Sequence, residues 1–298
     1  AFSYLARKTR TLSQPVVCVF DEFPYAALAD SSLPSTLQIA IDHHLKQSNV
    51  MFVLSGSNEG FMESRVLGSK SPLYGRRTSQ MKLQPFDYVE AAAMMPAVTD
   101  PSELLRYYAT FGGTPYYLSQ IDDHAPYEDN VSQLLFSKSG LLYEEPMMLL
   151  RQELREPALY NSVLYAVASG ATSQKRIAEA AGMEPASAGK YLKTLEDLGL
   201  LVREVPFGEN SARSKRGLYR VRDPFFAYWY KFVSPNVGAV EAGVGAQAMQ
   251  KRALGDSLLT YEGKIFELVC LQWIKRVNRH SELPFLATEF GRWWGTNP

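Results

Sequence analysis

The chain has 298 residues, 46% of them hydrophobic and 21% charged, which is an ordinary composition for a globular protein of two or three domains. Its 31 Lys and Arg balance its 31 Asp and Glu, so the net charge singles out no nucleic-acid or membrane partner. The sequence contains no run of 18 apolar residues and no signal-peptide core, so we expect a cytoplasmic protein without a membrane partner.

Residues 16–22 read Val-Val-Cys-Val-Phe-Asp-Glu, the pattern of a buried parallel strand that ends in two carboxylates. In open α/β sheets the carboxyl ends of the strands face the ligand. Asp21 could hold Mg²⁺ there, and Glu22 could polarise an attacking water. The same pattern is also typical of a buried strand that simply meets a polar loop, so this motif alone leaves both interpretations open.

A second strand is predicted to follow the first through a helix. Residues 35–47 have helical spacing with Ser35 as the expected N-cap, and residues 50–54 form another apolar run. A strand, helix and strand in this order predict a parallel pair, so Ser57 or Asn58 should emerge beside the two acids. Such a polar tip could sense the γ-phosphate, although a Ser/Asn turn that serves only backbone hydrogen bonding is the alternative.

Two further segments extend this pattern. Residues 72–77 place two arginines after a glycine in a loop. Residues 83–90 predict a short strand that leads into a helix, with Asp87 as N-cap and Glu90 three residues later.

The chain resembles the archaeal-type P-loop ATPases of the AAA+/STAND group. The resemblance covers nearly the whole chain and rests on five ordered motifs: VFDEFPY at 19–25, LSGSNEGFM at 54–62, LYGRRT at 73–78, LQPFDY at 83–88 and GGTPYYL at 112–118. It implies that the complete protein uses ATP and Mg²⁺.

The resemblance also implies residue roles at the first two motifs. Asp21 and Glu22 correspond to the Walker B acids. In this family the first acid holds the metal ion, so Asp21 would be the metal ligand and Glu22 the catalytic base. Ser57, or its neighbour Asn58, matches the sensor position.

The resemblance further implies that residues of two later motifs contact the nucleotide. Arg76 or Arg77 would contact phosphate, either in cis or from a neighbouring subunit of a homo-oligomer. Pro115 matches an element that packs against adenine. Solvated loop charges and a helix-breaking turn are the simpler interpretations of the same residues.

The sequence departs from this family in one respect. No GxxxxGK[ST] sequence occurs in the 298 residues, so the phosphate-binding loop is not among them. We therefore expect a fragment or a degenerate member, with the fragment favoured, and little ATP or Mg²⁺ binding and no hydrolysis by these residues alone.

The second half predicts a winged helix. Its expected elements are helices over 157–169, 173–181 and 185–198 and two hairpin strands over 200–205 and 217–221. Residues 170–222 hold ten Lys and Arg against six Asp and Glu, an excess that suits duplex DNA. The candidates for the groove and the backbone are Ser187, Lys190, Lys193, Arg213, Lys215 and Arg216. Internal packing or protein contacts are the alternative use of such a module.

The remaining residues predict a hydrophobic core segment, a linker and the start of another domain. The aromatic run 223–230 is expected in the core, and residues 236–256 as a linker or loosely packed helix. Residues 258–298 resemble the start of a nuclease-like domain, in which Glu267 or Glu262 would be the first metal acid. Because the later acids of such a site are not in the sequence, we expect both glutamates to face solvent or make capping contacts.

The expected fold class is α/β plus mainly α. Residues 1–100 would form a partial P-loop sheet, 101–155 a helical lid, 156–235 the winged helix and 236–298 the linker and a truncated α/β domain. The leading function is an ATP-binding and ATP-hydrolysing AAA+-type ATPase with a DNA-binding module. The alternative is a winged-helix DNA-binding or protein-interaction regulator whose α/β region is only structural.

Overall fold

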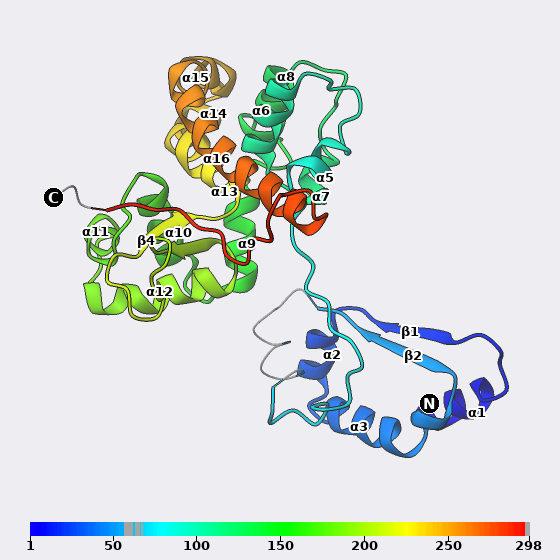
Figure 1. Ribbon diagram of the computed structural model, residues 1–298. Helices are drawn as coiled ribbons and strands as arrows, with labels where there is room; N and C mark the ends of the chain where they lie inside the picture. Colours follow the sequence, from blue (N-terminus) through cyan, green and yellow to red (C-terminus); the bar gives the residue numbers. More distant parts are fainter. Residues whose placement is uncertain (57–61, 63–65, 67, 296–298) are drawn as a thin grey trace. The chain divides into compact units, whose positions relative to one another are not determined.

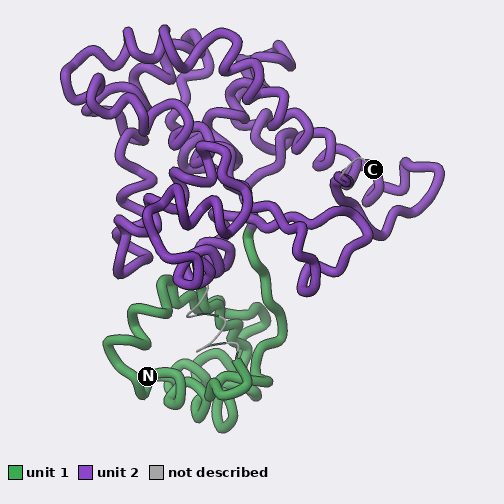
Figure 2. The backbone as a smooth tube through the Cα atoms, turned by 90° about the vertical axis from the view of Figure 1, so that its left-hand side faces the viewer, with its two compact units in different colours: residues 1–83 green, residues 84–298 purple. Residues whose placement is uncertain are grey.

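The computed structural model describes residues 1–56, 62, 66 and 68–295. It divides the chain into two compact units, residues 1–83 and 84–298 (Figure 1 and Figure 2), each with its own hydrophobic core. The structure is mixed α/β and mostly helical, with one small parallel sheet. Within the described ranges, no helix has both the length and the apolar character needed to cross a membrane.

The first unit contains the parallel sheet. Strand β1 (Val16–Phe20) pairs with β2 (Val50–Leu54) over five residues, with Phe20 opposite Leu54. In the described part of this unit, the helices with assigned bounds are α1 (Phe2–Thr9), α2 (Phe23–Ala29), α3 (Leu33–His43) and the 3₁₀ turn η1 (Leu45–Gln47). Helices α2 and α3 provide the crossover that a parallel pair requires, so the predicted strand–helix–strand unit is confirmed.

Helix α3 begins earlier than the sequence pattern predicts. Ser32 precedes its first turn and Pro34 lies inside that turn, so Ser35 is a helical residue and the prediction of Ser35 as N-cap is wrong. The fixed φ of proline suits the first helical turn, which accounts for the earlier start.

Among the described residues of this unit, side chains pack against one face of the sheet. Phe20 and Phe52 stack with their ring centroids 6.0 Å apart, and Phe2 from α1 contacts both rings. Side chains alternate along a strand, so Val17 and Val19 of β1 point to the opposite face, where they are exposed. The predicted buried strand is therefore only half-buried, because the described helices of this unit pack against one side of the sheet.

The second unit is helical apart from one antiparallel pair of strands. Its first part contains α5 (Tyr88–Ala92), α6 (Pro101–Phe111), α7 (Pro115–Leu118), α8 (Tyr127–Leu135) and α9 (Glu145–Glu153). Then follow α10 (Pro157–Ala168), α11 (Gln174–Ala180), α12 (Pro185–Asp197) and the paired strands β3 (Leu201–Glu204) and β4 (Leu218–Val221). The last part contains α13 (Pro224–Tyr228), the π-helical turn η3 (Trp229–Val233), the 3₁₀ turn η4 (Ser234–Asn236), α14 (Val237–Glu241), α15 (Gly245–Arg252) and α16 (Asp256–Arg279).

Local signals correctly predicted the start of α5. The Asp87 side chain accepts a hydrogen bond from the backbone of Glu90, and the Glu90 side chain accepts one from the backbone of Asp87. This reciprocal capping box is the predicted one. The short strand expected over residues 83–86 does not form, because this segment has no strand partner among the described residues.

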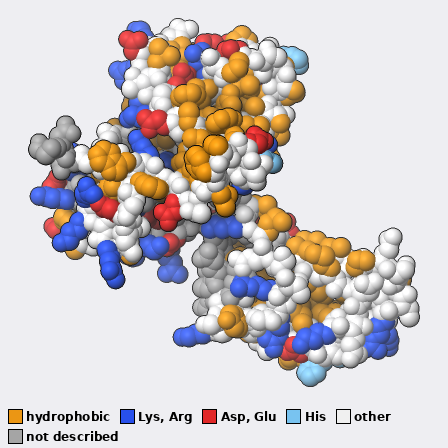
Figure 3. All heavy atoms as spheres, in the orientation of Figure 1, with side chains coloured by type: hydrophobic (Ala, Val, Ile, Leu, Met, Phe, Trp, Pro, Cys, Tyr) orange, Lys and Arg blue, Asp and Glu red, His pale blue; other side chains and the backbone are white. Residues whose placement is uncertain are grey.

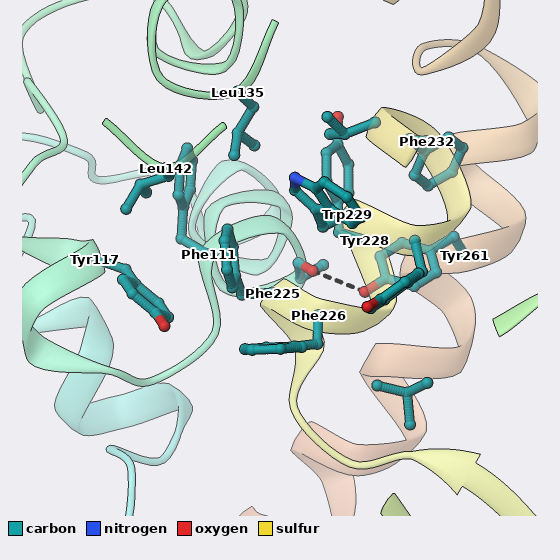
Figure 4. Packing of buried hydrophobic residues seen from close by; sticks show 14 of the residues in the cluster. Phe111, Tyr117, Leu135, Leu142, Phe225, Phe226, Tyr228, Trp229, Phe232 and Tyr261 are labelled. Atoms are coloured by element: carbon teal, nitrogen blue, oxygen red, sulfur yellow. Dashed lines mark hydrogen bonds between the residues drawn. The ribbon is translucent and has the colours of Figure 1, made fainter. Parts of the chain in front are cut away.

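Aromatic side chains fill the core of the second unit (Figure 4). The Tyr261 hydroxyl lies 2.9 Å from the carbonyl oxygen of Ala109 and 2.8 Å from that of Pro224, so it links α16 to α6 and to the start of α13. The predicted core position of the aromatic run 223–230 is confirmed by its buried rings. Of the two alternatives predicted for residues 236–256, a linker or a loosely packed helix, the structure has helices, because α14 and α15 form there and bury Val240 and Met249.

Candidate functional site

The parallel register of the first unit places Asp21 beside Ser55. The backbone N–H of Ser55 donates to the Phe20 carbonyl oxygen at 3.0 Å, and this bond extends the strand ladder by one residue. The Ser55 hydroxyl then donates to Oδ1 of Asp21 at 2.7 Å, and the backbone N–H of Glu22 donates to the same atom at 3.1 Å. An exposed carboxylate is thereby held in a defined position at the carboxyl edge of the sheet.

Glu22 has an unusual backbone conformation. Its φ of 48° and ψ of 45° lie in the left-handed region, which residues other than glycine rarely adopt. Glu22 precedes the first residue of α2, and the next N–H, that of Phe23, donates to the Ser55 carbonyl oxygen at 2.9 Å. The strand-to-helix turn is therefore tied to the end of β2 on both sides of Glu22. Backbone strain of this kind is concentrated at functional sites.

Gly56 allows the end of β2 to approach α2 closely. A Cβ atom on Gly56 would lie 2.6 Å from Cδ of Pro24, which is closer than real Cβ contacts come. Ser57 and Asn58, the predicted sensor residues, lie outside the described residues. Ser55 was missed in the sequence analysis, although its place directly after the strand opposite Asp21 could have indicated it.

The two predicted phosphate-contacting arginines have different surroundings. The Arg76 guanidinium forms a bidentate pair with Asp42, with Nη2 and Oδ2 2.7 Å apart, and it also donates to the carbonyl oxygens of Pro72 and Tyr74. Its hydrogen bonds, together with the hydrogen bond from Lys46, lower the pKa of the Asp42 carboxyl to about 2. Arg77 is exposed beside it. Arg76 therefore organises the loop, and Arg77 is the arginine that faces solvent.

In the second unit, two of the ordered motifs meet. The Phe86 N–H donates to the Gly113 carbonyl oxygen at 2.8 Å, and a Cβ atom on Gly113 would lie 2.0 Å from the Phe86 carbonyl oxygen. Gly112 has a φ of 68° and lies against the Asp223 carboxylate, whose pKa is raised by burial to about 6. Pro115 begins α7 and is exposed.

The candidate DNA-contacting residues of α12 lie on its outer face. Ser187, Lys190 and Lys193 are all exposed, whereas Ala188 and Leu192 between them are buried. Lys193 pairs with Asp197 one turn later at 2.5 Å.

The loop between β3 and β4 is organised by its own charges. The Arg203 guanidinium donates to the carbonyl oxygens of Ser211 and Ser214 at 2.8 and 2.7 Å. Glu209 accepts a hydrogen bond from the Ser214 hydroxyl and forms an ion pair with Arg216. The two remaining cations of the loop, Arg213 and Lys215, are exposed and have no carboxylate partner within the described ranges.

Comparisons with known proteins agree with the fold and the motifs. Residues 1–121 match an ATPase domain found predominantly in Archaea, and residues 229–298 match archaeal and bacterial proteins of unknown function. A Walker-type ATPase of Pyrococcus abyssi has a similar fold, with a TM-score of 0.54 and 18% identity over 77% of this chain and 66% of that one. Residues 1–121 thus match an archaeal-type ATPase domain, and the fold resembles that of a Walker-type ATPase.

A curated relative shows how much of such a protein the chain represents. An uncharacterised protein of Methanocaldococcus jannaschii is 30% identical over 279 residues, which are 93% of this chain and 62% of that protein. The chain thus spans less than two thirds of the length of this relative.

The oxygen atoms at the carboxyl end of β1 fit a magnesium ion bound together with a nucleotide. Mg²⁺ prefers oxygen ligands and is commonly held by one or two carboxylates together with substrate phosphates. Asp21 presents a carboxylate beside the Ser55 hydroxyl. In the part of the chain that the structure describes, no three His, Cys, Asp or Glu side chains form a metal cluster, so an all-protein metal cage is not present there.

The structure corrects the prediction for Glu262. This residue is only 8% exposed, and its carboxylate pairs with Nε of Arg106 at 2.9 Å, which joins α16 to α6. Glu267, in contrast, is exposed and pairs with Arg292 at 2.8 Å. The expectation of a solvent-facing side chain fails for Glu262 because a cation 156 residues away in the sequence lies against it.

Replacing Glu262 with alanine is expected to lower the free energy of unfolding of the second unit by about 2–3 kcal/mol. The Arg106 guanidinium, which is one third exposed, would lose its carboxylate partner while it remains partly buried. Urea unfolding of the full chain measures the change. Glu267→Ala is the matched control, and we expect it to cost less than about 1 kcal/mol because its ion pair is exposed. Equal losses in the two variants would contradict the structural role of Glu262.

Proposed function

We propose that this protein binds ATP with Mg²⁺ and hydrolyses it at the carboxyl end of β1. The observation that carries this proposal is the hydrogen-bonded pair of Asp21 and Ser55 at the carboxyl edge of the parallel sheet. Open α/β sheets bind their ligands at this edge. Asp21 would hold the metal, which neutralises charge on the phosphates when bound.

Glu22 is the proposed general base. Its backbone is fixed by the left-handed turn and by the hydrogen bond from Phe23 to Ser55, so the start of its side chain is fixed as well. A carboxylate adjacent to the metal ligand can accept a proton from an attacking water. Ser57 or Asn58 would orient that water.

The remaining nucleotide contacts are proposed to come from a loop and from the lid. Arg77 is the better candidate for a phosphate contact, in cis or from a neighbouring subunit, because the Arg76 guanidinium is already paired with Asp42. Pro115, exposed at the start of α7, would pack against adenine from a lid formed by residues 101–155.

The test of the ATPase proposal is Mg²⁺-dependent ATP turnover by the complete natural gene product and by its Glu22→Gln variant. Loss of turnover in the variant supports the proposed base. Unchanged turnover would refute the assignment of these acids.

We further propose that residues 156–235 form a winged helix that binds duplex DNA, with α12 in the groove and the β3–β4 loop as the wing. The supporting observation is that Lys190 of α12 and Arg213 and Lys215 of the loop are exposed cations. Figure 3 shows Lys and Arg side chains gathered over the region of α11, α12 and the two strands. Cations in this arrangement suit a phosphate backbone.

The salt dependence of duplex binding by the full chain tests the DNA proposal. The variant Lys190→Ala/Arg213→Ala/Lys215→Ala is expected to weaken binding and to reduce the slope of log affinity against log salt by about 2–3, because each lost phosphate contact removes about 0.9. The exposed Lys251 of α15 provides a control, and Lys251→Ala should leave the slope unchanged. No binding, or a flat response to salt, would refute the proposal.

A further inference from the structure

A hollow lies beside the last turns of α16. Its volume of about 360 Å³ is within the range of small-molecule sites. None of its lining residues takes part in the proposed ATP or DNA sites. They are Asp87 at the start of α5, Gln272, Lys275, Asn278 and Arg279 of α16, and Phe290 of the segment that follows α16.

Two cations line this hollow from one face of α16. Lys275 and Arg279 are four residues apart, so their side chains are neighbours on the helix surface, and both are exposed. Like charges at this spacing destabilise a helix, and neither cation pairs with a carboxylate among the residues that the structure describes. The helix dipole favours cations at this end of α16, but it does not require two of them to line the same hollow. An anion bound between them would offset their repulsion.

The carboxylate in the wall of the hollow is already engaged. The backbone N–H of Glu90 donates to Oδ1 of Asp87 at 3.0 Å, and Nη1 of Arg276 lies 3.4 Å from its Oδ2. Asp87 is therefore balanced by Arg276, and the positive charges of Lys275 and Arg279 remain for a ligand.

Hydrogen bonds hold the walls of the hollow in place. The Gln272 side chain accepts from the Tyr88 N–H at 3.0 Å and donates to the Tyr108 hydroxyl at 2.7 Å, which fixes α5 against α16. The Asn278 side chain donates to the Ala287 carbonyl oxygen and accepts from the Ala287 N–H, each at 2.9 Å. These two bonds hold the segment after α16 where it turns back alongside the helix (Figure 1). A preformed site needs little ordering when it binds a ligand.

The two amides also offer donors to a ligand. Each amide nitrogen uses one N–H in the bonds above, and within the described ranges its second N–H has no acceptor. Because Gln272 and Asn278 both line the hollow, two neutral donors accompany the two cations. This set of groups is complementary to an anion that has several oxygen atoms.

An aromatic ring forms another part of the wall. Phe290 is half-buried, and Nζ of Lys275 lies 5.9 Å from the centre of its ring. A ligand whose anionic group contacts Lys275 can therefore place a planar group against Phe290. Aromatic rings prefer such partners in offset-stacked or edge-to-face arrangements.

We propose that this hollow binds a small phosphate monoester that carries a planar ring, with the phosphate between Lys275 and Arg279 and the ring against Phe290. A phosphate monoester has nearly two negative charges at neutral pH, which match the two cations, whereas a carboxylate has one. Arginine and lysine are both common phosphate ligands. The proposal does not depend on ATP hydrolysis or on DNA binding.

The test measures the binding of phenyl phosphate to the full chain by ligand-observed NMR at neutral pH and physiological salt. Benzoate keeps the ring but has one negative charge, and inorganic phosphate keeps the charge but has no ring. We expect phenyl phosphate to bind about ten times more tightly than benzoate and about three times more tightly than inorganic phosphate.

Two variants separate the contributions of the charges and of the ring. Lys275→Gln/Arg279→Gln should weaken the binding of phenyl phosphate by about tenfold or more. Its thermal stability should equal or exceed that of the wild type, because a like-charge contact is removed. Phe290→Leu should weaken the binding of phenyl phosphate about threefold and leave that of inorganic phosphate unchanged.

A charge-matched control separates the hollow from general electrostatics. The exposed cations Arg151 and Lys251 lie on other helices, and Arg151→Gln/Lys251→Gln should change the affinity for phenyl phosphate by less than about twofold. The proposal would be overturned if phenyl phosphate showed no saturable binding or bound no more tightly than benzoate. It would also be overturned if this control lost as much affinity as Lys275→Gln/Arg279→Gln.

Discussion

Replacing Glu22 with glutamine is expected to reduce the ATP turnover number of the complete natural gene product by about 100-fold or more. Glutamine has nearly the same shape but cannot accept a proton from water at neutral pH. Because Asp21 is left intact, binding of ATP with Mg²⁺ should be retained. Steady-state turnover and a separate nucleotide-binding measurement distinguish these two effects.

The geometry around Glu22 is the reason to expect a large effect. Its left-handed backbone conformation and the neighbouring hydrogen bond from Phe23 to Ser55 fix the backbone of Glu22 in the turn between β1 and α2, next to Asp21. The matched control is Asp30→Asn, which removes an exposed carboxylate after α2 and should leave turnover within about twofold. Similar turnover in the wild type and the Glu22→Gln variant would show that Glu22 is not the base.

Replacing Gly113 with alanine is expected to destabilise the second unit by about 3 kcal/mol or more. The added Cβ would lie 2.0 Å from the carbonyl oxygen of Phe86, and both partners in this contact are backbone. Phe86 and Gly113 also share a backbone hydrogen bond, and the Tyr108 hydroxyl donates to the Phe86 carbonyl oxygen. The segment around Phe86 and the segment around Gly113 therefore cannot move apart without breaking these hydrogen bonds. The collision must therefore displace α5 or the start of α7.

Thermal and urea unfolding of the full chain measure this effect. Gly263→Ala is the control, because Gly263 is exposed on α16 and its Cβ would meet no atom within 4 Å. We expect the control to be neutral or to stabilise by up to about 1 kcal/mol, since alanine is a better helix former. A Gly113→Ala variant as stable as the control would show that these two segments do not approach as described.

Elements set by local signals were predictable from the sequence. The capping box of Asp87 and Glu90 depends on residues only three positions apart. The parallel pairing of β1 with β2 followed from the strand–helix–strand order. These features need no knowledge of what packs against them.

Features set by contacts between distant segments were not predictable. The role of Ser55 depends on the strand register, and the pairing of Arg76 with Asp42 joins a loop to a helix 34 residues earlier. Glu262 meets Arg106 only because α6 packs on α16. Each of these polar residues looks like a solvent-exposed residue in the sequence, and only its long-range neighbour gives it a structural role.

The most direct test of the central claim is a Mg²⁺ titration of ATP turnover in the complete natural gene product. The claim is that the end of β1 carries a metal ligand, Asp21, followed by a catalytic base, Glu22. We predict that Asp21→Asn raises the Mg²⁺ concentration needed for half-maximal turnover at least tenfold. Glu22→Gln should lower the maximum without moving that midpoint. If the Mg²⁺ midpoint of Asp21→Asn were unchanged, Asp21 would not be the metal ligand. If the maximal turnover of Glu22→Gln were unchanged, Glu22 would not be the catalytic base.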